Sequence, residues 1–308
     1  MDYSVQFQAA PAGDAPLPVD RSDPAARIAP ALPPPNRTAR KARARLRLFA
    51  LRQEIPSWVY KALSFATFLS VIGAWAWLSQ QSFVNNVFLP TPARVWEALR
   101  GCWDDGSLWD DIKISALRVT AGFILSALIA IPVGVWLGSF KFIEGIVQPF
   151  TEFVRYIPVP ALIPVLMLCF GIGETAKIML IFVGTFFQLT LMVADEIRRV
   201  PYELAQVSFT LGATRREVVW LVLFKAALPG IFDALRLCNG WAWTYLMVAE
   251  LIAANEGLGY RILKFSRFLQ TPKMFVYLLV LGSIGLGLDF LFRKLNARLF
   301  RWADTTKR

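Results

Sequence analysis

The chain has 308 residues, of which 56% are hydrophobic and 18% are charged, and its mean hydropathy is +0.48. A typical soluble domain contains ~25% charged residues, so this composition argues against a soluble globular protein. The net charge of +11 is compatible with two classes of protein, a nucleic-acid binder and a membrane protein with basic loops. The apolar content favours the membrane protein. The sequence contains no histidine, which excludes catalysis or metal binding by that side chain, and its three cysteines form no CxxC pair.

The positive charge is concentrated at the two ends of the chain. Residues 37–61 contain eight basic side chains and one acidic one, and residues 293–308 contain six basic side chains and one acidic one. The rest of the chain therefore carries a net charge of −1. Because basic residues keep flanking segments on the cytoplasmic side of a membrane, we expect both termini in the cytoplasm.

The composition also divides the chain into regions. Residues 1–36 contain eight prolines and few large apolar side chains, so they bury too little surface to offset chain entropy and are predicted to be a disordered extension. Residues 37–58 are expected to be a basic cytoplasmic or interfacial segment, acting either as an orientation signal or as a short helix on anionic lipid. Residues 59–302 are then the transmembrane domain, and residues 303–308 are a C-terminal tail.

Six stretches of the chain are apolar and close to the ~20 residues that a helix needs to cross the hydrocarbon core. They are residues 59–78, 115–138, 150–170, 176–194, 231–254 and 275–292. The third stretch is interrupted by Pro158, Pro160 and Pro164, which break helical hydrogen bonding. These prolines either begin a helix at the interface or lie at membrane depth, where irregular backbone is tolerated if it is buried in protein or lines a cavity.

Two patterns within these stretches predict side-chain or helix contacts. Glu152 and Arg155 are three residues apart, share a helix face and are expected to pair. Gly282, Gly285 and Gly287 in the sixth stretch are spaced for close contact with another helix.

The charges of the loops predict the direction of the spans. The loop after the first span contains four aspartates at residues 104–111 and is expected outside, and the arginine-containing loop after the fourth span is expected inside. The loop between the fifth and sixth spans disagrees with this topology, because six spans place it outside although it is basic. Its basic residues are Arg261, Lys264, Arg267 and Lys273.

The cytoplasmic loop at about residues 195–229 is too polar to cross a bilayer and too long for a tight turn. Pro201 suits a first helical turn and Glu203 suits the positive end of a helix dipole, so residues 202–211 are predicted to be a short amphipathic helix that ends at Gly212. A second amphipathic run begins at about residue 214. A short helix displayed on such a loop is typical of a docking element.

Several segments, taken together and in this order, resemble one family of transport proteins. They are FLPTP at residues 88–92, IPVG at 131–134, YIPVP at 156–160, FGIGETAK at 170–177, AELIAA at 249–254 and GLGY at 257–260. This pattern is similar to the permease subunits of binding-protein-dependent ATP-binding-cassette (ABC) importers, and more narrowly to the nitrate, taurine, alkanesulfonate and bicarbonate permeases. The resemblance covers residues 83–302.

The resemblance implies an all-α integral membrane protein with six transmembrane helices, the type I ABC importer permease (MetI-like) fold, and cytoplasmic N- and C-termini. It implies a permease subunit that forms the translocation pathway for a small anionic solute, with taurine or an alkanesulfonate favoured and nitrate or bicarbonate next. The chain contains no GxxxxGK[ST] phosphate loop. We therefore expect it not to be an enzyme, to carry no metal or cofactor, and to rely on a separate ATPase that binds ATP and Mg²⁺.

The same resemblance implies the partners and the location of the chain. The expected partners are ABC ATPase subunits, a second permease copy in a homodimer, a periplasmic or lipid-anchored solute-binding protein, and membrane lipid, with no nucleic acid. The expected location is the bacterial inner (cytoplasmic) membrane.

In this family the cytoplasmic loop forms a coupling helix that enters a groove on the ATPase. The usual motif reads Glu-Ala-Ala, three residues, Gly, and later Leu-Pro. When its glycine is aligned with Gly212, residues 206–208 read Gln-Val-Ser and residues 224–225 read Phe-Lys, so only the glycine matches. The residues expected to couple to the ATPase are Tyr202, Glu203, Leu204, Ala205, Gln206, Val207, Ser208, Gly212 and Ala213.

Polar side chains within the spans are candidates for the translocation pathway. They are Gln188, Asn239, Trp243, Thr244 and Glu250. For the amide and hydroxyl side chains an interhelical hydrogen bond is an equal alternative, and for Glu250 a structural role is favoured because an unpaired carboxylate repels an anion. Arg118, near the outer end of the second span, is expected to extend its head group to the interface.

Two other classes of membrane protein remain as alternatives. A stand-alone secondary transporter or channel predicts uptake by this chain alone, although the spans show no obvious inverted repeat. A membrane enzyme is disfavoured, because the sequence has no histidine, no cluster of metal ligands and no nucleophile elbow.

Overall fold

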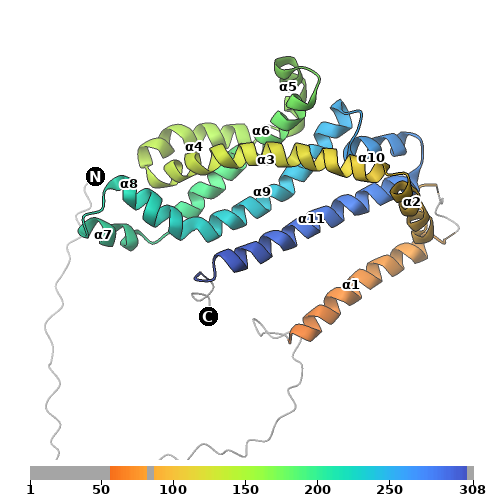
Figure 1. Ribbon diagram of the computed structural model, residues 1–308, viewed down its shortest axis with the longest axis horizontal. Helices are drawn as coiled ribbons and strands as arrows, with labels where there is room; N and C mark the ends of the chain where they lie inside the picture. Colours follow the sequence, from red (N-terminus) through yellow and green to blue (C-terminus); the bar gives the residue numbers. More distant parts are fainter. Residues whose placement is uncertain (1–55, 82–86, 304–308) are drawn as a thin grey trace, which may run out of the picture. The chain divides into compact units, whose positions relative to one another are not determined.

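The computed structural model describes residues 56–81 and 87–303, and every regular element within them is a helix. The elements are α1 (Ser57–Leu78), α2 (Pro92–Asp104), α3 (Ser107–Ser139), α4 (Lys141–Arg155), η2 (Val159–Leu162), α5 (Ile163–Phe170), α6 (Glu174–Arg198), α7 (Tyr202–Thr210), α8 (Arg215–Glu217), η3 (Val218–Leu223), α9 (Phe224–Ala253), α10 (Leu258–Arg267) and α11 (Thr271–Leu299) (Figure 1). The chain divides into two units, residues 1–64 and 65–308. Of the first unit only the start of α1 is described, so the expectations for residues 1–36 and for most of 37–58 lie outside the described residues. Residues 304–308 of the expected C-terminal tail also lie outside the described residues.

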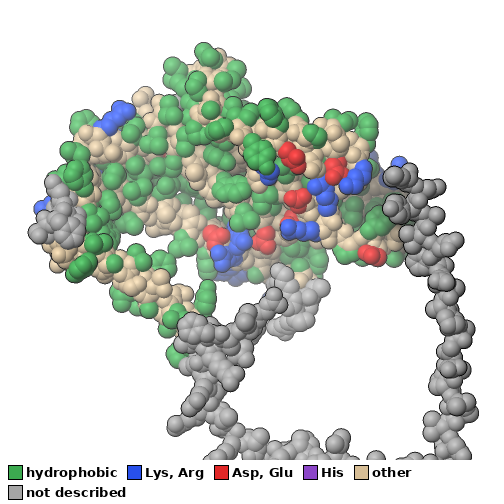
Figure 2. Space-filling view, turned by 180° about the vertical axis from the view of Figure 1, so that it is seen from behind, with side chains coloured by type: hydrophobic (Ala, Val, Ile, Leu, Met, Phe, Trp, Pro, Cys, Tyr) green, Lys and Arg blue, Asp and Glu red, His purple; other side chains and the backbone are tan. Residues whose placement is uncertain are grey.

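Five helical runs are long and apolar enough to cross a membrane. They are α1, α3, α6, the continuous run Arg215–Ile252 and α11. These runs confirm five of the six expected spans as long apolar helices, and α3, α6 and α11 extend beyond the expected limits at both ends. Large apolar side chains cover much of the surface (Figure 2), as is typical of a protein whose solvent is lipid.

The third expected span is confirmed as irregular, but its first helix begins earlier than expected, at Lys141. α4 and the segment Val159–Phe170 meet at an angle of 93°, and the two together make the sixth span only if the bent pair counts as one. The backbone leaves the helical conformation around Pro158. A proline ring clashes with the residue before it, and this clash disfavours the α-helical conformation of that residue. Pro160 and Pro164 then stand in the first turns of η2 and α5, where the missing N–H group costs little.

The core is built on the packing of α3 against α6, with α9 beside them. Three glycines of α3 allow this close approach, because an added Cβ at Gly122, Gly134 or Gly138 would lie 2.7–2.8 Å from a backbone oxygen of α6. This is the small-residue packing typical of membrane helices. The glycines of α11 behave differently: a Cβ at Gly282, at Gly285 or at Gly287 would meet no atom within 4 Å among the described residues. The expected close contact of these α11 glycines is therefore absent within this part of the chain.

Candidate functional site

The segment between α6 and α8 contains the short helix that the sequence predicts. α7 begins directly after Pro201, with Glu203 in its first turn. Gly212 follows with a φ of +86°, a left-handed conformation that favours glycine. Its N–H donates to the carbonyl of Phe209 at 3.0 Å, and the N–H of Ala213 donates to that of Ser208 at 3.0 Å. The expected helix 202–211 and its glycine stop are therefore confirmed to within one residue.

The second amphipathic run is the beginning of a membrane helix. Thr214 and Glu217 form a reciprocal capping box at the start of α8, which satisfies free N–H groups at a helix N-terminus. The chain then continues without a break through η3 into α9. α7 is thus joined through a short turn to a helix of 38 residues.

α7 presents most of the expected coupling residues to the surroundings of the chain. Among those nine residues Ala205 is buried, Ser208 and Ala213 are half-buried, and the other six are exposed. Large apolar side chains are exposed on α7 and its turn: Tyr202, Leu204, Val207, Phe209 and Leu211. Exposed apolar groups gathered on one short helix mark a contact with protein or membrane. The sequence motif had not singled out Phe209 and Leu211, although their apolar character in a polar loop was the available signal.

A second feature is a cavity of about 210 Å³ between α4, α6, α9 and the irregular backbone after α4. Its polar lining includes Gln188, Thr244 and Arg155. The structure thus brings together two of the expected pathway residues, and it adds Arg155, which the sequence had assigned to a pair with Glu152. The structure describes both residues and does not show the predicted ion pair between Glu152 and Arg155. Glu152 accepts a hydrogen bond from Gln148 at 2.8 Å, and the guanidinium of Arg155 lies 5.1 Å from the centroid of the Tyr156 ring.

The other expected pathway residues do not line this cavity. Asn239 is half-buried and Trp243 is buried, and Trp241 contributes to the lining in its place. Glu250 is fully buried in a network of charged groups nearer the C-terminal end of α9. A role of these three side chains in a pathway stays a prediction.

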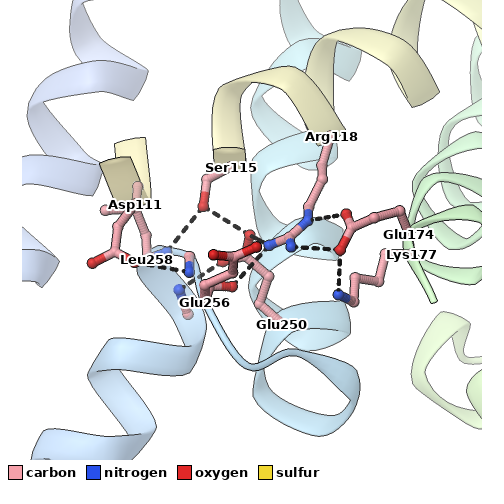
Figure 3. A network of polar contacts seen from close by, with 10 residues as sticks. Asp111, Ser115, Arg118, Glu174, Lys177, Glu250, Glu256 and Leu258 are labelled. Atoms are coloured by element: carbon pink, nitrogen blue, oxygen red, sulfur yellow. Dashed lines mark hydrogen bonds and ion pairs between the residues drawn. The ribbon is translucent and has the colours of Figure 1, made fainter. Parts of the chain in front are cut away.

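The network around Glu250 is centred on Arg118, which is also fully buried (Figure 3). Its Nη1 donates to Glu250 Oε1 at 2.8 Å and to the carbonyl of Glu256 at 2.9 Å. Its Nε and Nη2 donate to the two carboxylate oxygens of Glu174, at 2.5 and 2.7 Å. The expectation that Arg118 extends to the interface is therefore wrong, because α6 and α9 supply carboxylates that hold the guanidinium inside.

The turn between α9 and α10 closes the same network. Ser115 donates to Glu250 Oε1 at 2.7 Å and accepts from the N–H of Leu258 at 2.9 Å, while the N–H of Gly259 donates to Glu250 Oε2 at 2.8 Å. Gly257 has a φ of +112°, and an added Cβ there would meet the Glu250 carboxylate at 2.4 Å. The glycines of the GLGY segment thus let the turn wrap around a buried carboxylate.

Asp111 extends the network to α10 and α11 and changes the interpretation of the basic loop. It accepts hydrogen bonds at 2.9 Å from the N–H of Gly257, from Arg261 Nε and from the hydroxyl of Tyr277. Because Arg261 is neutralised by Asp111, it does not act as a free loop charge against the six-span topology. Lys273 lies 5.7 Å from the centroid of the Phe265 ring. The network therefore ties α3, α6, α9, α10 and α11 together at the end remote from α7 (Figure 1).

The described residues hold no group of three or more acidic or cysteine side chains placed to bind a metal ion. The charges of the network are paired with one another, which makes it a structural clamp. Two features open to other molecules include residues that the sequence had singled out: the exposed surface of α7 and the cavity beside Gln188. Arg198, at the end of α6, joins that helix to α4 by donating to Gln148 at 2.8 Å.

The chain is similar to known proteins in sequence and in fold. Residues 130–301 match the family described as binding-protein-dependent transport system inner membrane component. The taurine transport system permease protein TauC of Escherichia coli (strain K12) is 32% identical over 245 residues, which cover 78% of this chain and 89% of that protein. The bicarbonate transport system permease protein CmpB of Synechococcus elongatus is 28% identical, over 66% of this chain and 72% of that protein. A chain of the inward-facing MetNI methionine ABC transporter has a TM-score of 0.59 at 21% identity, covering 62% of this chain and 95% of that chain.

Proposed function

Since the chain belongs to the family of binding-protein-dependent transport system inner membrane components, we propose that it is the permease subunit of an ABC importer driven by a separate ATPase. The chain supplies the translocation pathway, and ATP and Mg²⁺ bind to the partner ATPase. The solute carries a small anionic group, and taurine, whose sulfonate is accompanied by an ammonium, or an alkanesulfonate is favoured over nitrate or bicarbonate. The basis for this order is the taurine permease relative at 32% identity, compared with 28% for the bicarbonate permease.

The observation that carries the proposal is the exposed apolar surface of α7. Its large side chains, such as Leu211 with 83% exposure, have no covering element among the described residues, and the chain has no phosphate loop of its own. A groove on an ATPase subunit would bury these side chains. When ATP closes the ATPase dimer, a pull on α7 would pass through the Thr214 cap into α9 and through Arg198 into α4.

The assembly that we propose contains two copies of this chain, two ATPase subunits beneath them and a periplasmic or lipid-anchored solute-binding protein above them. A homodimer presents each pathway residue twice around a central axis. In this arrangement α7 and both termini face the cytoplasm of a bacterial inner membrane. The buried network around Arg118 then lies at the periplasmic end of the chain, where it fixes the helix ends that the binding protein would contact.

The solute is tested by uptake into proteoliposomes that contain the complete complex. Labelled taurine, an alkanesulfonate, nitrate and bicarbonate are supplied in turn with the cognate binding protein and ATP. We expect ATP-dependent uptake of taurine or the alkanesulfonate to exceed that of the other two anions, with vesicles that lack the permease as the control. Uptake of nitrate or bicarbonate alone would overturn the sulfonate assignment, and ATP-dependent uptake of none of the four would overturn the proposed solute class.

A further inference from the structure

The cavity between α4, α6 and α9 is lined by residues from the interior of two helices that are long enough to cross a membrane. Gln188 is near the middle of α6, and Thr244 lies in the second half of α9. Ile157 and Val159, from the irregular segment between α4 and α5, form another part of the wall. Irregular backbone at membrane depth is tolerated where it lines a cavity, and sites built from broken helices near the midplane are typical of transporters.

The charge of the cavity is positive. Arg155 is its one charged lining residue, accompanied by the amide of Gln188 and the hydroxyl of Thr244. Among the described residues Arg155 has no carboxylate within ion-pair distance. Its contacts are with Tyr156: the guanidinium lies over the ring, and Nη2 donates to the hydroxyl at 3.3 Å. Arg118 and Arg198, by contrast, each contact two carboxylates.

The size and donors of the cavity indicate a class of ligand. A volume of about 210 Å³ is below the ~300–1,000 Å³ of pockets for drug-sized ligands. A guanidinium presents a fork of N–H groups that matches a planar or tetrahedral oxyanion. Gln188 adds a neutral amide donor. The Thr244 hydroxyl donates to the carbonyl of Gly240 at 3.5 Å in the free chain, and rotation about its χ1 would turn it toward a bound anion.

We propose that this cavity is an anion-binding site within the membrane domain, in which Arg155 binds the sulfonate or carboxylate group of the solute and Gln188 and Thr244 donate hydrogen bonds to it. The inference rests on the proposed importer function and adds a selective site in the permease itself. Discrimination between solutes then occurs in this chain as well as in the binding protein. Arg155 is exposed in the free chain, so it is available to an arriving anion.

The test compares Arg155→Gln with the wild-type complex in proteoliposomes, using labelled taurine, or labelled bicarbonate if the wild type takes up only that anion. Loss of a charge-assisted hydrogen bond to an anion predicts a fall in uptake of about 10- to 100-fold. ATPase activity stimulated by the loaded binding protein is expected to stay unchanged, because α7 and its turn are intact. Arg155→Lys, which keeps the charge, is expected to restore part of the uptake, and Thr244→Val to lower uptake by a smaller factor.

Arg100→Gln is the matched control. Arg100 is also exposed and also lies over an aromatic ring, 5.5 Å from the centroid of Trp96, but it is in α2 and does not line the cavity. Uptake by the complex with Arg100→Gln is expected to equal that of the wild-type complex. Unchanged uptake by Arg155→Gln would overturn the anion site while leaving the importer function in place. A parallel fall of uptake and ATPase activity would also overturn it, because Arg155 would then act in coupling or folding. Failure of the wild-type complex to take up any anion would count against the proposed function itself.

Discussion

Replacing Arg118 with methionine is expected to destabilise the chain by about 3–5 kcal/mol, the usual cost of removing one partner from a buried ion pair. The substitution leaves Glu250 as a fully buried carboxylate without its cation. It also removes the donors that join α3 to α6 and to the α9–α10 turn. The effect is measured as the midpoint of thermal unfolding of the purified chain in detergent, together with the monodisperse fraction.

The control for this prediction lies on the same helix. Lys113 pairs with Asp110 at 3.5 Å, but both side chains are largely exposed, and exposed pairs contribute little. Lys113→Met is therefore expected to leave the unfolding midpoint unchanged. Adding Glu250→Gln to Arg118→Met removes the uncompensated charge and is expected to recover part of the loss. An Arg118→Met chain that unfolds at the wild-type temperature would show that the network does not hold the helices together.

The second large effect is expected at the turn after α7. Gly212 has a φ of +86°, and placing an L side chain in the left-handed region costs roughly 1–2 kcal/mol. We expect Gly212→Val to reduce the population of the correct turn, and with it ATP-driven uptake by the complex, by about 5- to 30-fold. An added Cβ at Gly212 meets no atom within 4 Å. The effect therefore arises from the backbone and not from a clash.

Gly106 provides a matched comparison, since it has a φ of +71° and equally open surroundings, but it lies between α2 and α3. Gly106→Val imposes the same kind of backbone strain far from α7 and is expected to retain ATP-driven uptake. Both variants are assayed for uptake and for binding to the ATPase. Equal uptake by the two variants would mean that the α7 turn has no special role in coupling.

The long apolar helices were predictable from the sequence because hydropathy and length alone decide them. The angle of the bend between α4 and α5 was not predictable, because residues 150–170 are apolar on both sides of Pro158. This angle depends on packing against α6. α2 was also missed as a helix. Its amphipathic surface is anchored by Trp75, whose Nε1 donates to the carbonyl of Pro90 just before the helix at 3.1 Å, and this contact joins segments that are separate in the sequence.

The candidate site was predictable where its signal is local. Pro201, Glu203 and Gly212 mark the ends of α7, and the structure agrees. The network around Arg118 joins residues that are 56 and 132 positions apart, and nothing in a single sequence pairs them. Arg155 was assigned to a neighbour on its own helix, because helical spacing cannot show that α4 ends there and that the side chain reaches a cavity between other helices.

We propose that this permease moves solute only when a separate ATPase acts on α7. The most direct test is solute uptake into two sets of proteoliposomes, one with the chain alone and one with the chain, its ATPase and the loaded binding protein. We expect no uptake by the chain alone under a proton or sodium gradient, and uptake by the complete complex that stops when ATP is removed. Uptake by the chain alone, driven by an ion gradient and indifferent to ATP, would contradict it and identify a secondary transporter.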